Sequence, residues 1–152
     1  MPTLVRPFAS FHSAAFNLSE QRDIFIQDSN FGNDVAEWLA DRLSDEGFEV
    51  SDQIHQDETG WFVPFEKDAD KFDLGVTALS VDNQTWLVWI EPTPGFFGKM
   101  LGRHRTPVPE AVLRKLHQIL AKSPAVEALR WHTREQFKRG DFDEGEISPV
   151  AP

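Results

Sequence analysis

Residues 31–65 read FGNDVAEWLADRLSDEGFEVSDQIHQDETGWFVPF, and this stretch decides the fold class. Apolar side chains recur in it at helical spacing: Val35, Trp38, Leu39 and Leu43. That spacing predicts an amphipathic helix over about 33–46 with one face turned to a core. Gly47 can adopt the left-handed conformation that ends a helix, and Phe48 then begins a strand. The stretch therefore predicts a helix followed directly by β-structure.

Four segments with strand character follow this helix. They cover residues 48–54, 60–66, 72–81 and 85–91, which are rich in aromatic and β-branched residues or alternate between apolar and polar ones. The turn at 81–84 predicts that the last two form a hairpin. Pro64 has no N–H to donate, so its strand is expected at an edge of the sheet or beside a bulge.

The rest of the chain adds one strand on each side and a second helix. Residues 22–28 precede the first helix as a short strand, a second helix begins at Pro109 and stops at Ser123, and 126–131 form a closing strand. A short helical turn follows at 134–138. This order predicts an α+β two-layer sandwich, in which two main helices cover one face of a mostly antiparallel sheet of about five or six strands.

The size of the chain predicts one domain. Its 152 residues, 40% of them hydrophobic, can bury a core without disulfides or metals. We expect an extended lead-in at 1–20 with an edge strand around residues 5–11, a single domain at 21–138, and a flexible acidic tail at 139–152 that does not bury itself.

Composition narrows the classes of partner. The chain has 25 acidic and 15 basic residues, a net charge of −10, and no cysteine. A field of that sign repels phosphate backbones and anionic lipids and attracts basic partners. No stretch of the chain has the length of apolar sequence that a membrane span or a signal peptide needs. We therefore expect a cytoplasmic protein that binds neither nucleic acid nor membrane.

The longest loop, at 92–109, is the first candidate site. It combines exposed aromatics with cations in an otherwise acidic chain: Phe96, Phe97, Lys99, Arg103 and Arg105. Aromatic and Arg side chains are typical of protein-binding hot spots. The glycine spacing of a nucleotide-binding loop is absent, which leaves a carboxylate or monophosphate held by the two arginines as one alternative. A loop simply packed on the sheet is the other.

The acidic turn at 55–61 is the second candidate. Asp57 and Glu58 lie beside Trp61, which suits a pocket with two carboxylates and an apolar wall. The alternative is a solvated turn next to a core tryptophan.

Metal and covalent chemistry lack their sequence signatures. The five histidines form no helical pair with metal-ligand spacing, and no Gly-x-Ser-x-Gly motif occurs. The sequence thus predicts no metal and no cofactor.

The first part of the chain resembles a group of small bacterial domains of uncharacterised function. In that group a D-x-A-x-W-L helix and a G-x-x-V strand precede an E-D-x-G-W turn. This chain has Asp34-Val35-Ala36-Glu37-Trp38-Leu39, then Gly47-Phe48-Glu49-Val50, then Asp57-Glu58-Thr59-Gly60-Trp61. The group is loosely similar to the immunity proteins that accompany toxins.

Three hypotheses for function follow. The first is a non-catalytic protein-binding domain, immunity-like or regulatory, acting through the 96–105 loop or the acidic surface near Asp57. The second is a small-molecule or anion-binding domain, or an enzyme, with a pocket between the sheet and the 92–109 loop. The third is a housekeeping protein without a dedicated site.

Overall fold

A computed structural model gives the structure of the chain and describes residues 6–16, 32–56, 60–68, 70–80, 82–92, 108–140 and 145–150. In chain order the elements are β1 (Phe8–His12), α1 (Asn33–Asp45), β2 (Glu49–Val50), β3 (His55–Gln56), β4 (Trp61–Lys67), β5 (Asp70–Ser80), β6 (Thr85–Pro92), α3 (Glu110–Lys122), β7 (Glu127–His132) and α4 (Arg134–Arg139).

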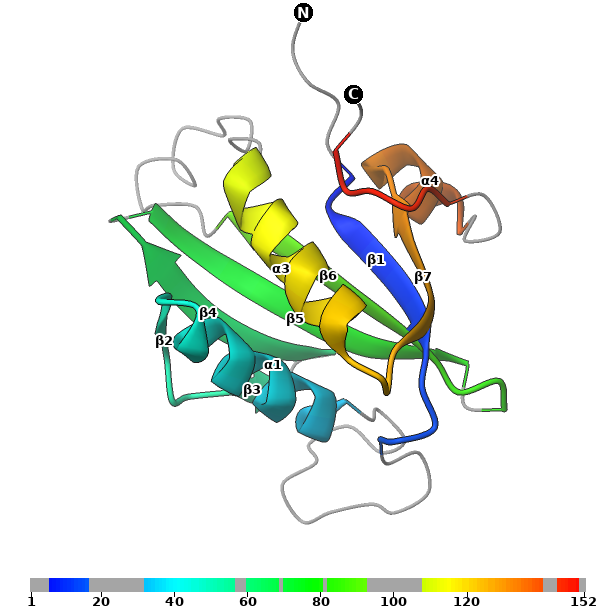
Figure 1. The fold of residues 1–152 in the computed structure, drawn as a ribbon, viewed down its shortest axis with the longest axis horizontal. Coiled ribbons are helices and arrows are strands. Elements are labelled where there is room, and N and C mark those ends of the chain that lie inside the picture. The colour runs from blue at the N-terminus through cyan, green and yellow to red at the C-terminus, as the bar shows by residue number, and fades with distance from the viewer. Residues whose placement is uncertain are drawn as a thin grey trace, which may run out of the picture.

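The strands form one seven-stranded sheet in the order β2-β4-β5-β6-β1-β7, with β3 also paired to β4. Every pairing between these strands is antiparallel. Helices α1 and α3 contact each other and lie across the same face of the sheet (Figure 1), which we call the helix face. This arrangement confirms the predicted α+β two-layer sandwich.

Helix α1 forms where the apolar spacing predicts it. Val35, Ala36, Leu39 and Leu43 are buried on its inner side. Gly47 follows the helix at φ 94°, a conformation that a side chain would strain, and the Phe48 N–H then bonds back to the Leu43 carbonyl at 3.1 Å. The chain thereby reverses into β2.

Helix α3 supplies the second half of this layer. Pro109 precedes its first turn, and its buried residues are Val112, Leu113, Leu116, Ile119 and Leu120. On the sheet side, the same core contains alternate residues of five strands, among them Phe11, Val63, Leu74, Val88 and Trp131. The main core therefore lies between the two helices and the helix face.

Pro64 determines where the edge of the sheet is broken. Ser51 N–H donates to the Pro64 carbonyl at 2.8 Å, but Pro64 has no N–H to return the bond that an antiparallel pair normally exchanges. Pairing continues only at His55, so that residues 51–54 lie opposite residues 63–64. Strand β4 is thus second from the edge, and the irregularity expected around Pro64 falls on its neighbours β2 and β3.

The opposite face of the sheet, called here the second face, carries its own aromatic row. Trp89 pairs with Gly75, and Gly75 pairs in turn with Phe62. Because Gly75 has no side chain, the Trp89 indole lies across β5 and meets Phe62 edge-on, with ring centroids 5.8 Å apart. Phe8 stacks on Trp89 at 6.3 Å and on Phe137 of α4 at 4.2 Å.

Both ends of the chain contribute more to the fold than the sequence predicts. Strand β1 lies between β6 and β7, so it is an interior strand and not an edge strand in a lead-in. Trp131 and Glu146 exchange backbone hydrogen bonds of 2.7 and 2.9 Å, and Val150 is buried. Backbone pairing needs no apolar sequence, which is why composition did not reveal the pairing of Glu146 or the burial of Val150. The strand predicted at 22–28 lies outside the described residues.

We predict that Gly75→Ala destabilises the protein. A Cβ at this position would lie 2.2 Å from Cε2 of Trp89 and would force the buried indole out of place. Overpacking of this kind costs about 1–3 kcal/mol of the free energy of unfolding. Urea unfolding followed by far-UV circular dichroism measures it.

The matched control is the same substitution in a Trp89→Leu background. With the indole gone, the added methyl group should cost clearly less than in the wild-type background, because the coupling between the two positions is steric. Equal costs in both backgrounds would contradict the proposed contact.

Candidate functional site

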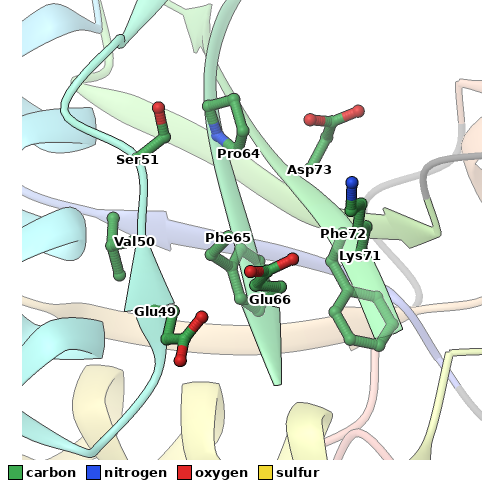
Figure 2. A pocket seen from close by; sticks show the side chains of 9 residues that line it. All are labelled: Glu49, Val50, Ser51, Pro64, Phe65, Glu66, Lys71, Phe72 and Asp73. Atoms are coloured by element: carbon green, nitrogen blue, oxygen red, sulfur yellow. The ribbon is translucent and has the colours of Figure 1, made fainter. Parts of the chain in front are cut away.

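A hollow of about 490 Å³ lies at the ends of β2, β4 and β5. We call it the acidic hollow, and it is lined by Glu49, Val50, Ser51, Pro64, Phe65, Glu66, Lys71, Phe72 and Asp73. Phe65 and Phe72 belong to the main core, so alternation along the strands places Glu66, Lys71 and Asp73 on the second face. Figure 2 shows the Glu49 and Glu66 carboxylates projecting from neighbouring strands.

The charges of this hollow are unusually arranged. Glu49 pairs directly with Glu66 across β2 and β4, and Asp73 pairs directly with Glu91 across β5 and β6. Carboxylates directly opposite each other on one face repel and destabilise a sheet. Lys71 pairs with Glu66 on its other side, but no ion pair within 4.0 Å joins these two described residues. The Glu49–Glu66 pair concentrates negative potential where a cation would relieve it.

A second hollow of about 260 Å³ lies beside the aromatic row on the same face. We call it the aromatic hollow, and its lining is Phe8, Thr77, Leu87, Trp89, Glu91, Arg134 and Phe137. Trp89 Nε1–H donates to Glu91 Oε1 at 3.1 Å, and the Arg134 guanidinium carbon lies 5.7 Å from the centre of the Phe8 ring. Apolar walls with a few polar groups are typical of small-molecule sites.

A third hollow of about 370 Å³ runs between α1 and α3 on their outer side. Its charged groups are largely paired with each other or with a neighbour: Arg42 bonds Asp45 at 3.2 Å, and Glu46 bonds Lys115 of the other helix at 3.2 Å. Ion pairs at a helix surface of this kind are typical of packing. We assign the third hollow a structural role.

The structure places Trp61 in the main core, where it is 3% exposed and lies against the start of α1 at Gly32. Core packing was the alternative that the sequence left open for this residue. Asp57 and Glu58 lie outside the described residues. So do all five loop residues predicted to bind a partner: Phe96, Phe97, Lys99, Arg103 and Arg105. Their roles stay predictions.

Sequence reasoning missed both hollows of the second face. Glu49, Glu66 and Asp73 are separated along the chain and resemble ordinary solvated strand residues. Only the register, which pairs Glu49 with Glu66 and Asp73 with Glu91, brings their charges together. Arg134 likewise lines the aromatic hollow only because α4 lies against the sheet at this place. The alternation of side chains along each strand could have predicted that each carboxylate lies on the second face. It could not have predicted which carboxylate lies opposite it on the next strand.

The described histidines are scattered over the fold. His132 is fully buried, and its Nε2 lies 2.7 Å from the Ser10 hydroxyl oxygen. A serine beside a histidine is the geometry of nucleophilic catalysis, but neither residue lines any of the three hollows. Within the described ranges, no group of three or more His, Asp and Glu side chains is placed to hold a metal ion, and no helix is long and apolar enough to span a membrane.

One histidine has a perturbed protonation equilibrium. Burial, together with the nearby Arg114 guanidinium, lowers the pKa of His117 from its usual 6.5. Trp131 Nε1–H donates to His117 Nδ1 at 3.0 Å, and this bond requires that Nδ1 carry no proton. The neutral imidazole therefore joins α3 to β7.

We predict that this histidine makes stability depend on pH. Its pKa is lower in the folded than in the unfolded chain, so its contribution is fully present above pH 6.5 and is lost as the pH falls through the folded value. Urea unfolding of wild type and His117→Gln between pH 5 and 8 measures this, since glutamine keeps an acceptor but does not titrate. Identical pH dependence in the two proteins would refute the prediction.

Comparison with known proteins identifies no relative: no protein-family model, no curated protein and no solved structure matches the chain.

Proposed function

We propose that this chain is a non-catalytic protein-binding domain that recognises a basic segment of its partner at the acidic hollow. The observation that carries the proposal is the direct pairing of Glu49 with Glu66 across neighbouring strands. Such a pair lowers the stability of a lone sheet. A Lys or Arg side chain seated between the two carboxylates would convert that repulsion into two charge-assisted interactions.

Charge on a larger scale supports the same partner. The net charge of −10 attracts a basic protein over distances comparable with the Debye length, about 8 Å at physiological ionic strength. At the hollow itself, Ser51 adds a hydroxyl group and Pro64 adds apolar surface beside the carboxylates. A long basic side chain, with an apolar stem and a charged head, suits both kinds of lining.

The biological role of such a domain follows from the kind of partner that it binds. An immunity-like or regulatory protein would act by occupying a basic surface that its partner needs elsewhere, and it needs no reaction of its own. The predicted loop residues, Phe96 to Arg105, would then add aromatic contacts to the same complex or to another. That part of the proposal rests on the sequence alone.

We predict that a short fluorescein-labelled Lys-rich peptide binds this protein and that Glu49→Gln with Glu66→Gln weakens binding. Exposed charge pairs contribute about 0.2–1 kcal/mol each, so loss of two should lower affinity by about 2–30-fold. Fluorescence anisotropy at low and high salt measures the affinity. Binding should also weaken as salt rises.

The matched control removes two charges from the outer side of α1. Glu37→Gln with Asp41→Asn changes the net charge equally at two exposed positions away from the hollow. If this control weakened the peptide as much as the Glu49 and Glu66 pair, attraction would be diffuse and the site would be wrong. If spermidine bound as tightly as the peptide, a protein partner would be contradicted in favour of a small polyamine.

We also predict that Glu49→Gln makes the unliganded protein more stable. Its carboxylate faces only Glu66 within the described pairing, so neutralising it removes a repulsion worth about 0.2–1 kcal/mol. Urea unfolding at neutral pH and low salt measures the gain. A gain in stability combined with a loss of peptide affinity is typical of a binding site kept at some cost to the fold; a loss of stability would show that Glu49 has a structural role.

A further inference from the structure

We propose that the aromatic hollow binds a small zwitterion with a flat apolar body, of the chemical class of the free aromatic amino acids. The proposal is independent of the acidic hollow. It follows from three kinds of group that line one cavity: a cation, a carboxylate and a set of aromatic rings.

The rings provide the floor. Phe8 and Phe137 stack almost in parallel, 9° apart with centroids at 4.2 Å, and the Trp89 indole lies next to both. Phe137 is 37% exposed, so part of this aromatic surface faces solvent. A further ring can extend such a stack and bury the exposed edge.

The cation is available for an anion. Arg134 lies over the Phe8 ring, and among the residues that the structure describes it forms no ion pair. Contact with an aromatic face restricts the guanidinium without using its five N–H donors. Those donors can hold a ligand carboxylate in the two-bond geometry that arginine favours.

The Glu91 carboxylate would bind the positively charged group of the ligand. Glu91 Oε1 accepts the hydrogen bond from Trp89 Nε1–H, which fixes the acid group beside the indole. Glu91 and Arg134 line the same cavity, yet no ion pair joins these two described residues. A ligand that carries both an ammonium and a carboxylate group matches both, whereas a simple anion or a simple cation would meet one group of its own sign.

Cavity size limits the occupant. At about 260 Å³ the hollow falls just below the range of roughly 300–1,000 Å³ that is usual for drug-sized ligands. Something about as large as one amino acid is therefore appropriate, with Thr77 as a further polar contact.

The test compares four probes by isothermal titration calorimetry on the full chain. L-Phenylalanine carries all three features, 3-phenylpropionate lacks the ammonium group, phenethylamine lacks the carboxylate, and L-alanine lacks the ring. We expect L-phenylalanine to bind at least about tenfold more tightly than each of the others. Equal affinity for L-phenylalanine and either single-charge probe, or no binding of L-phenylalanine at all, would overturn the proposal.

Two variants test which side chain binds which charged group of the ligand. Arg134→Gln should weaken L-phenylalanine and 3-phenylpropionate but strengthen phenethylamine, and Glu91→Gln should weaken L-phenylalanine and phenethylamine but strengthen 3-phenylpropionate, because each change removes the group that repels the probe of its own sign. The matched controls are Lys138→Gln and Glu135→Gln, exposed positions of α4 that do not line the hollow and should leave all affinities unchanged. Thermal melting confirms that each variant folds.

Failure here is distinguishable from failure of the proposed function. The peptide experiment changes Glu49 and Glu66, and this one changes Arg134 and Glu91. Competition adds a further criterion: L-phenylalanine should not displace the Lys-rich peptide. Displacement by the amino acid would show that the two ligands share one site and would overturn the assignment of the zwitterion to the aromatic hollow.

Discussion

The contact between Trp89 and Gly75 is the constraint on which the second face depends. A two-layer sandwich covers one face of its sheet with helices, so the apolar side chains of the other face must be buried by other contacts. Here the missing side chain of Gly75 lets one indole cross a strand and meet Phe62. Trp89 thus links the rings of β4 to those of β1 and α4, and one row of aromatic groups spans the centre of the sheet.

The same row divides the charged surface. Asp73 and Glu91 form the cross-strand pair next to Gly75 and Trp89 in the register, and Pro64 continues their row into β4. The acidic hollow therefore lies towards one end of the strands. The aromatic hollow, with Arg134 at its rim, lies over the row itself. The two hollows thus lie at different positions along the strands of one face and differ in lining, one mainly charged and the other mainly aromatic.

Local sequence determined most of the architecture. The spacing of Val35, Leu39 and Leu43 and the glycine after them predicted α1 closely, and alternation predicted β5. β1 was misjudged because its short, mixed sequence carries no sign that two other strands flank it. Pairing between strands distant in sequence depends on tertiary packing, and the candidate sites depend on that pairing. This is why single carboxylates were visible in the sequence while the Glu49–Glu66 pair was not.

The break opposite Pro64 also limits how another chain could extend this edge of the sheet. An exposed edge strand is a template on which another chain can extend the sheet. Here the outermost segments, β2 and β3, have only two residues each and are separated by residues 51–54, which leave the ladder. A second strand could align with no more than a short stretch before its hydrogen bonds fell out of register. The proline that interrupts this edge of the sheet thus leaves it without a long, unbroken strand on which another chain could pair.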